Sequence, residues 1–347
     1  MIDHAPWLPP AVLLPTLAVL GLLVGSFLNV VVHRLPRMLE RDWLTGVGQT
    51  LQDDPTMQRV LPADTALRTA LAAQGRALEQ TLDAQPPLNL SQPRSRCPHC
   101  GHGIRWYENI PVLSWLALRA RCSACKAPIS WRYPLVELVT AVLFTAAGAH
   151  ALGLATAPGG AASGLTPLAA TQIGAASAGL GQPLAFTALW CVALALLLAA
   201  ALIDLDTTLL PDELTLPLMG LGLLGAWQGW TGVRLDDAAL GLLFGYGGLW
   251  ALAFVYRLIR GVEGMAEGDF KLLGALGALL GWQSLPDIVL LSSAVGAAVG
   301  ITLIVARGHD RQVPIPFGPY LAGGGIAALF FGPTLLFGPL VAAAWTR

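Results

Sequence analysis

Apolar runs long enough to cross a lipid bilayer recur along most of this sequence. A helix needs about 20 apolar residues to span a hydrocarbon core about 30 Å thick. We expect such helices at residues 10–33, 134–154, 184–203, 213–230, 237–256, 287–305 and 318–345. A shorter glycine-rich run, residues 270–285, makes the topology consistent when it is counted as well. The sequence therefore predicts an all-α polytopic membrane protein of about eight transmembrane helices.

The charged residues are few and gather in one part of the chain. Only 12% of the residues are charged and 55% are hydrophobic, whereas a soluble domain is usually about 25% charged. A net charge of −1 gives no basic field for nucleic acid, so no nucleic-acid partner is expected. Thirteen of the twenty Lys and Arg residues lie between Arg34 and Arg132. We expect a first transmembrane anchor at 1–33, a cytoplasmic polar domain at 34–133 and a transmembrane core at 134–347.

The first apolar run has the features of a retained anchor and not of a cleaved signal peptide. Its N-terminal flank carries no Lys or Arg, and the run is longer than the core of a signal peptide. Arg34 and Arg37 follow the run instead of preceding it. The C-terminal end of this helix is therefore expected in the cytoplasm.

The remaining topology follows from the positions of Lys and Arg, which favour cytoplasmic loops. This rule places three segments in the cytoplasm: residues 34–133, the Arg257/Arg260 loop and the Arg307/Arg311 loop. Alternation puts residues 155–183 and the Arg234 loop outside. Asp204 and Asp269 then both face the cytoplasm.

Small residues at helical spacing predict close helix packing. Gly241/Gly245, Gly277/Gly281 and Gly296/Gly300 have the spacing that lets transmembrane helices approach closely. Packing within one chain is favoured over dimerisation, and the oligomeric state stays open.

Leucines at helical spacing predict one amphipathic helix over residues 63–84 of the polar domain. The flanking segments, residues 45–62 and 85–93, have the composition of linkers.

Four cysteines form two CxxC pairs separated by 21 residues: Cys97, Cys100, Cys122 and Cys125. This spacing is typical of four-thiolate zinc ribbons. A reducing cytoplasm favours metal over disulfides, so we expect a structural zinc ion in a zinc-ribbon-like insertion. A redox dithiol pair, or a site that recruits His99 or His102, is the alternative. Cys191 lies within a span and is expected to be an ordinary small apolar residue.

Two aspartates at the cytoplasmic ends of helices are candidates for catalysis. A carboxylate within a membrane helix is costly, so it indicates function by default. Asp204 ends the apolar run of residues 194–203, and Asp269 begins the short glycine-rich span. Two aspartates that share one proton can activate water and polarise a scissile carbonyl, as in aspartic proteases. From the residues alone, ion translocation and a buried polar contact stay open for both.

Three other acidic residues are expected to have structural roles. Asp212 follows Pro211 and precedes an apolar run, as a helix N-cap would. Asp206 is expected to be solvated or to support the site, and Glu137 to reach the membrane interface or support the polar domain.

Beyond these patterns, the chain resembles the bifunctional type IV prepilin peptidases along nearly its whole length. The matching stretches are residues 25–36 (GSFLNVVVHRLP), the double CxxC with 104–111 (IRWYENIP), 132–138 (RYPLVEL), 203–212 (IDLDTTLLPD), 268–272 (GDFKL) and 314–320 (PIPFGPY). The resemblance implies that Asp204 and Asp269 are the catalytic aspartates. Where the family has Gly two residues before its Gly-Asp pair, this chain has Ala266, which reduces backbone freedom there. Residues 45–93 also look longer than in close relatives.

The same resemblance implies two activities in the bacterial inner membrane. The enzyme would cleave the basic leader of prepilins and pseudopilins after a glycine at the cytoplasmic face. It would then methylate the new N-terminus with S-adenosylmethionine, a role associated with the cysteine-containing region. No glycine-rich nucleotide loop supports this second activity, so methyl transfer rests on the resemblance alone. Membrane lipid is the other expected partner.

Two other classes of function fit the membrane carboxylates. An ion-coupled transporter would relay protons through them, but we find no internal repeat of the kind common in transporters. A zinc-stabilised scaffold of a pilus or secretion machine would lose assembly, and not substrate cleavage, when Asp204 loses its charge.

Overall fold

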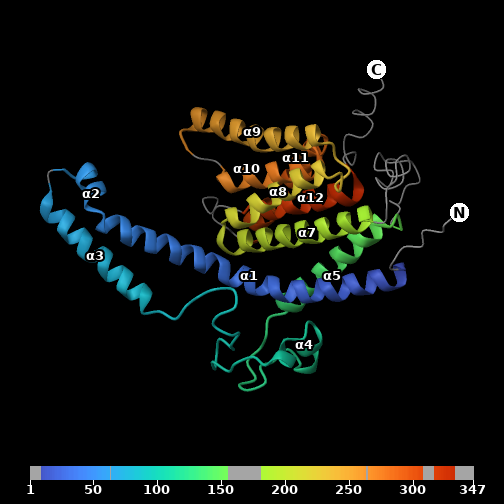
Figure 1. Cartoon of the computed structure of the whole chain (residues 1–347), viewed down its shortest axis with the longest axis horizontal. Helices are drawn as coiled ribbons and strands as arrows, with labels where there is room; N and C mark the ends of the chain where they lie inside the picture. Colours follow the sequence, from blue (N-terminus) through green and yellow to red (C-terminus); the bar gives the residue numbers. More distant parts are fainter. Residues whose placement is uncertain (1–8, 63, 155–180, 263–264, 308–315, 333–347) are drawn as a thin grey trace. The chain divides into compact units, whose positions relative to one another are not determined.

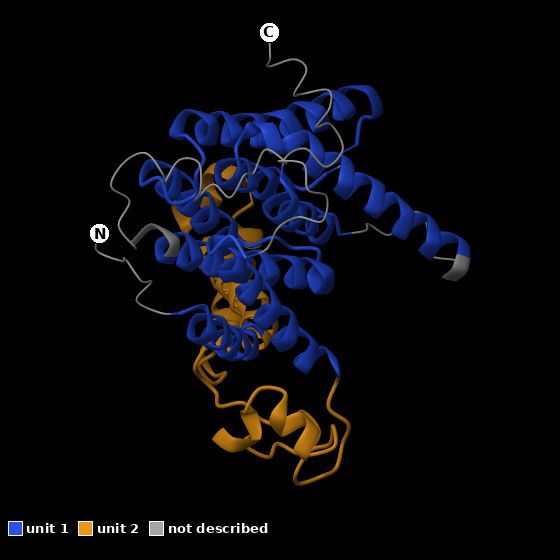
Figure 2. Cartoon of the chain, turned by 90° about the vertical axis from the view of Figure 1, so that its right-hand side faces the viewer, with its two compact units in different colours: residues 1–28, 131–347 blue, residues 29–130 orange. Residues whose placement is uncertain are grey.

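The structure, a computed structural model, divides the chain into two compact units (Figure 2). Unit 1 combines residues 1–28 with 131–347, and unit 2 comprises residues 29–130. The described residues are 9–62, 64–154, 181–262, 265–307 and 316–332. Within these ranges the regular elements are helices, and two isolated bridges are the only β-pairing.

Unit 1 is a bundle of helices (Figure 1). After the first part of α1 (Pro10–Gln52), its elements are α5 (Arg132–Ala151), α7 (Gly181–Thr207), α8 (Asp212–Trp227), α9 (Leu235–Arg260), α10 (Glu267–Leu280), η2 (Trp282–Ser284), α11 (Leu285–Arg307) and α12 (Gly318–Phe331). In the part of the chain that the structure describes, five helical segments are long and apolar enough to cross a membrane: Pro10–Gln52, Arg132–Ala151, Leu184–Thr207, Leu235–Arg260 and Trp282–Val305. The protein is thus an all-α polytopic membrane protein.

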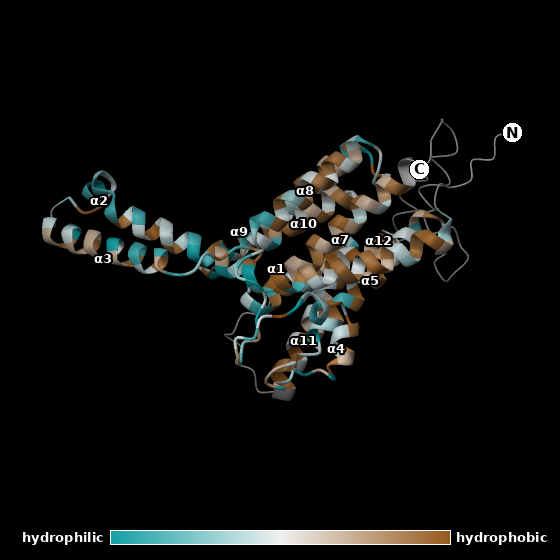
Figure 3. Cartoon of the chain, turned by 60° about the horizontal axis from the view of Figure 1, so that its bottom comes forward, coloured by the Kyte–Doolittle hydropathy of each residue, from teal (hydrophilic) through white to brown (hydrophobic). Residues whose placement is uncertain are grey.

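Three further helices coincide with predicted spans but are short. α8 has 16 residues, and α10 and α12 have 14 each, against the roughly 20 that a full crossing needs. The count of eight spans therefore stays a prediction. The predicted span 318–345 and the predicted external segment 155–183 lie partly outside the described residues. In Figure 3, α7, α10 and α12 are mostly hydrophobic, whereas α2 (Asp54–Val60) is mostly hydrophilic and α3 (Thr65–Asp83) carries both hydrophobic and hydrophilic residues.

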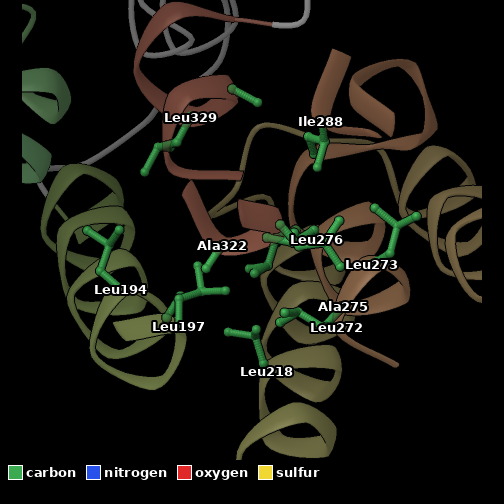
Figure 4. Packing of buried hydrophobic residues seen from close by; sticks show 14 of the residues in the cluster. Leu194, Leu197, Leu218, Leu272, Leu273, Ala275, Leu276, Ile288, Ala322 and Leu329 are labelled. Atoms are coloured by element: carbon green, nitrogen blue, oxygen red, sulfur yellow. The ribbon is translucent and has the colours of Figure 1, made fainter. Parts of the chain in front are cut away.

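α10 lies inside the bundle, in contact with α8, α9, α11 and α12. Most of its residues from Asp269 onwards are buried, on every face of the helix. Leu272 and Leu276 of α10 belong to one buried cluster with Leu218 of α8 and Ile288 of α11 (Figure 4). Because the helix is apolar on all faces, it is suited to such an enclosed position. Because neighbouring helices enclose α10, its ends need not reach the two membrane surfaces. The helix can therefore be shorter than the bilayer is thick.

Glycines let α9 and α10 pack backbone against backbone. A Cβ on Gly241 would meet backbone atoms of Gly277, and a Cβ on Gly245 would lie 2.6 Å from the carbonyl O of Leu273. The expected intramolecular packing is therefore confirmed for Gly241 and Gly245. Gly281 lies beyond the end of α10 and has φ 82°, so it ends that helix instead of continuing the packing face.

In unit 2, the second half of α1 lies against α3. A Cβ on Gly75 of α3 would lie 2.6 Å from the carbonyl O of Gly48. Gln52 Nε2 donates a hydrogen bond to Glu79 Oε2 at 2.9 Å. The expected helix over residues 63–84 is confirmed as α3, while residue 63 itself lies outside the described residues.

The expected linker at residues 45–62 is wrong, because this segment is mostly helical. Residues 45–52 continue α1 and residues 54–60 form α2. α1 continues because its last turns have a packing partner in α3, and Pro55 fits the first turn of α2. Composition gives no sign of such a partner.

The segment 85–93 has no regular structure, but side chains of α1 hold it. Arg34 donates hydrogen bonds to the carbonyl oxygens of Asn89 and Pro93, at 2.9 and 2.6 Å. Arg41 donates to the carbonyl oxygens of Leu82 and Pro86. The segment 85–93 is therefore held by hydrogen bonds and is not a free linker.

We expect Gly241→Ala to destabilise the bundle, because the added methyl group would force α9 and α10 apart. Overpacking of this kind costs about 1–3 kcal/mol, measurable as a lower midpoint of unfolding in detergent. Gly247→Ala on the same helix is the matched control, since nothing lies within 4 Å of a Cβ at that position. Equal midpoints for the two variants would contradict the backbone contact between α9 and α10.

Candidate active site and metal centre

Asp204 lies in the last turn of α7 and is buried, with 4% of its surface exposed. Its Oδ2 accepts a hydrogen bond from the backbone N–H of Gly318 at 2.9 Å. Thr208 adopts a left-handed conformation (φ 54°), and its N–H donates to the carbonyl O of Asp204 at 2.8 Å. The chain thus turns away directly after the carboxylate, in a conformation more usual for glycine.

The hydrogen bond to Asp204 comes from the N-terminus of α12. Gly318 is the first residue of that helix, and the first N–H groups of a helix have no partner within it and carry partial positive charge. A Cβ on Gly318 would lie 2.7 Å from Asp204 Oδ2. Only glycine lets the backbone approach the carboxylate this closely.

Asp269 is the third residue of α10 and is also buried, with 7% of its surface exposed. The charge of Asp204 acts on the Asp269 carboxyl group. Carboxyl groups from two helices, 65 positions apart in the sequence, are therefore near neighbours inside unit 1. Sequence reasoning expected this proximity.

Leu210 lies close to Gly268, which precedes Asp269, and to Gly318, which binds Asp204. A Cβ on Gly268, next to Asp269, would lie 2.6 Å from Leu210 Cβ. A Cβ on Gly318 would lie 3.2 Å from Leu210 Cδ1. Sequence reasoning assigned no role to Gly318 or Leu210, although both lie in stretches that carried the family resemblance. The position of Gly318 two residues after Pro316, before an apolar run, was the available sign of a helix start.

Ala266 does not strain the backbone before Asp269. It precedes α10 with φ −80° and ψ 149°, an extended conformation open to any L-residue. The reduced freedom of alanine relative to glycine therefore costs nothing in this conformation.

Asp206 and Asp212 form ion pairs next to the two buried carboxyl groups. Arg132 binds Asp206 through two hydrogen bonds of 2.8 Å each, which join α5 to α7. Lys271 Nζ contacts both oxygens of Asp212, at 2.9 and 3.0 Å, which joins α10 to α8. The expected N-cap role of Asp212 is wrong, because Pro211 occupies the cap position and Asp212 is already the first helical residue. The pattern around Pro211 could not predict this ion pair, because Lys271 comes from another helix.

Glu137 is buried in α5, with 7% of its surface exposed. A Cβ on Gly25 of α1 would lie 2.6 Å from the Cα of Glu137. Glu137 therefore lies at a close crossing of α1 and α5.

The four cysteines lie on two turns of matching construction in unit 2. The N–H of Cys97 donates to the carbonyl O of His102 at 2.9 Å, and the N–H of Cys122 to that of Ala127 at 2.8 Å. Left-handed residues occupy equivalent positions, with φ 71° at Gly101 and φ 61° at Lys126. Each turn is closed by an isolated antiparallel bridge. The repeated construction presents two thiols from each turn.

The sulfur atoms of Cys97, Cys100, Cys122 and Cys125 all lie within 4.8 Å of one another. In each turn the first cysteine is buried and the second is exposed. Backbone N–H groups of Cys125 and Ala124 lower the pKa of Cys122 to about 6, which favours the thiolate that metals bind. Four thiols at these mutual distances fit a tetrahedral zinc ion.

The alternatives for the cysteine cluster fit less well. Among the described residues, the group that could hold a metal contains the four cysteines and neither His99 nor His102. His102 Nε2 instead lies 3.4 Å from Glu108 Oε2. A redox pair would need two thiols, whereas here four thiols converge. Cys191 is buried in the apolar interior, as expected.

Two family models match this chain. Residues 19–151, which include the four cysteines, match the bacterial peptidase A24 N-terminal domain. Residues 191–301, which include Asp204 and Asp269, match the type IV leader peptidase family.

Individual proteins are similar over nearly the whole chain, although no solved structure matches. A prepilin leader peptidase/N-methyltransferase of Aeromonas hydrophila is 45% identical over 91% of this chain and 89% of its own length. Proteins of the same name from Burkholderia pseudomallei (strain 1026b) and Pseudomonas aeruginosa are 44% and 43% identical, over 94% and 96% of this chain and 87% and 94% of their own lengths. The chain therefore belongs to the type IV leader peptidase family.

Proposed function

We propose that Asp204 and Asp269 are the catalytic pair with which this chain cleaves the leader peptide of type IV prepilins. The chain is a prepilin peptidase with N-methyltransferase activity, by its family and by the names of its relatives. The proposal for the residues rests on one observation above all. Two aspartates from different helices are buried together, and a backbone N–H binds one of them.

The hydrogen bond from Gly318 distinguishes the two carboxyl groups. An N–H donor binds an ionised carboxylate more strongly than a neutral carboxyl group. Since two adjacent buried carboxyl groups do not both ionise readily, they share one proton. We therefore assign the charge to Asp204 and the proton to Asp269.

This assignment gives each aspartate a role in peptide hydrolysis. Asp204 takes a proton from a water molecule while the oxygen of that water attacks the scissile carbonyl carbon. Asp269 donates its proton to the carbonyl oxygen and stabilises the tetrahedral intermediate. Collapse of the intermediate breaks the C–N bond. The new amine receives the proton held by Asp204, and a hydroxyl group of the intermediate returns a proton to Asp269 as the carbonyl re-forms.

The substrate and the side of the membrane follow from the family and the distribution of charge. We assign cleavage to the bond after a glycine in the basic leader of prepilins and pseudopilins. The enriched Lys and Arg of residues 34–132 favour the cytoplasm for the segment that joins the first two spans. On the same ground we propose that both aspartates face the cytoplasm at the bacterial inner membrane.

Methyl transfer to the new N-terminus is the second activity, and we propose S-adenosylmethionine as the methyl donor. The relatives are named as N-methyltransferases. No residue of this chain is assigned to the donor.

We propose that the four cysteines hold one structural zinc ion. Four thiolates leave no coordination position for water, so such an ion stabilises a fold and does not activate a nucleophile. The residues between the two turns form only short helices, η1 (Trp106–Asn109) and α4 (Leu113–Ala117). A small segment of this kind gains much of its stability from the metal.

Asp204→Asn and Asp269→Asn should each abolish prepilin cleavage. Loss of a general acid or base lowers a rate by about 10²- to 10⁴-fold, and asparagine preserves the shape of the side chain. The measurement is the mass of a prepilin incubated with the reconstituted enzyme. Asp236→Asn, at an exposed carboxylate of α9, serves as the control and should cleave normally.

A second readout separates loss of catalysis from loss of folding. Both variants should still methylate a synthetic peptide that already carries the mature N-terminus when S-adenosylmethionine is supplied. Prepilin cleavage at the normal rate by both variants would refute the aspartate assignment and favour a transporter or a scaffold.

Gly318→Ala should slow cleavage with little change in substrate binding. The added methyl group would push the helix N-terminus away from Asp204 Oδ2, and small displacements of catalytic groups can cost about 10²-fold in rate. We expect kcat to fall and KM to change little. Gly323→Ala on the same helix has open space around the new methyl group and should behave as the unaltered protein. A normal kcat for Gly318→Ala would rule out a role for this contact.

Cys97→Ser should remove bound zinc. The purified protein is expected to contain one zinc ion per chain by elemental analysis, and the variant much less, because a serine hydroxyl is a poor replacement for a thiolate ligand. Cys191→Ser, outside the cluster, should keep one ion per chain. Full zinc content in Cys97→Ser would show that the four thiols do not form the site.

A further inference from the structure

Large apolar side chains are exposed on the segment between the two cysteine turns. Trp106 is 81% exposed, Leu113 65% and Leu116 58%. The full set within residues 104–116 is Ile104, Trp106, Tyr107, Ile110, Leu113 and Leu116. We call these six residues the apolar surface of unit 2. They lie on or next to η1 and α4, which contact each other.

The local structure holds these side chains outward. Trp115, on α4, donates a hydrogen bond from Nε1 to the carbonyl O of Ile129, next to the second cysteine turn. Leu113 and Leu116, three positions apart and thus on one face of α4, are exposed. Val112, just before α4, has φ 59°, an unusual conformation for a β-branched residue. These apolar side chains are therefore exposed by a defined local conformation.

Basic residues outnumber acidic ones in the segment that carries the apolar surface. Residues 94–130 contain a single acidic residue, Glu108, and six basic residues: Arg94, Arg96, Arg105, Arg119, Arg121 and Lys126. All six basic residues are exposed. Arg105 lies over the ring of Tyr107, 5.9 Å from its centroid. Exposed apolar and aromatic groups among cations are the combination that binds an anionic membrane surface.

The chain also keeps this segment near a bilayer. The segment lies between α1 and α5, which both qualify as membrane spans, and Ser130 is only two residues before the start of α5. Trp131 and Tyr133, at that start, are exposed, as residues of an interfacial aromatic belt would be. A tether of this kind makes even a weak surface contact favourable, because the local concentration of membrane is high.

We propose that the apolar surface of unit 2 docks on the anionic lipid of the membrane leaflet from which α5 starts. Trp106, Leu113 and Leu116 enter the headgroup region, and the six basic residues face lipid phosphates. The complementary charge favours anionic lipid over the leader peptide, whose own charge is basic in this family. Docking of this kind does not depend on the peptidase assignment.

Photo-crosslinking in the full-length protein tests this proposal. A benzophenone amino acid replaces Trp106 or Leu113, and the protein is placed in nanodiscs that contain phosphatidylglycerol or only phosphatidylcholine. After irradiation, lipid adducts are counted by mass spectrometry. Gln80, exposed on α3 of the same unit, is the control position. Circular dichroism checks that each variant is folded.

We expect lipid adducts at positions 106 and 113 at least several-fold above those at position 80, with a clear decrease when phosphatidylglycerol is left out. Yields no higher than at position 80 would overturn the proposal. Equal yields in the two lipids would overturn the anionic preference. Adducts to a second copy of the chain or to an added prepilin, in place of lipid, would assign the surface to a protein partner.

Discussion

The enclosure of α10 by its neighbouring helices is the constraint on which the rest of unit 1 depends. Gly241 and Gly245 bring α9 against α10 at backbone distance, while Leu218 and Ile288 pack on other sides. An enclosed helix removes its first-turn carboxylate, Asp269, from both lipid and bulk water. The second carboxyl group, that of Asp204 on α7, lies near it and accepts a hydrogen bond from the N-terminus of α12 at Gly318.

Ion pairs at the ends of the helices complement this enclosure. Arg132 with Asp206 links α5 to α7, the helix of Asp204, and Lys271 with Asp212 links α8 to α10, the helix of Asp269. Exposed ion pairs contribute little to stability on their own, typically about 0–1 kcal/mol. Their two-point geometry instead fixes how one helix end is placed against another. Asp206, two residues after Asp204, and Lys271, two residues after Asp269, are thus each held by an ion pair.

Sequence patterns predicted those features that depend on one helix or one short motif. Long apolar runs predicted the membrane helices, the CxxC spacing predicted four converging thiols, and leucine spacing predicted α3. Features that need a partner from elsewhere in the chain were missed. The helix that continues past residue 45 is supported by α3, and Asp212 binds a lysine of α10 instead of capping its own helix. The hydrogen bond from the Gly318 N–H to Asp204 was missed for the same reason.

The contact between Asp204 and Gly318 joins positions separated by 114 residues. During synthesis, α7 is therefore made and inserted well before α12 exists. For that interval Asp204 lacks the backbone N–H that binds it in the finished protein, and its carboxyl group is surrounded by an incomplete bundle. The buried pair takes its final form only when the last described helix is in place, so a partly made chain carries both aspartates without the finished site.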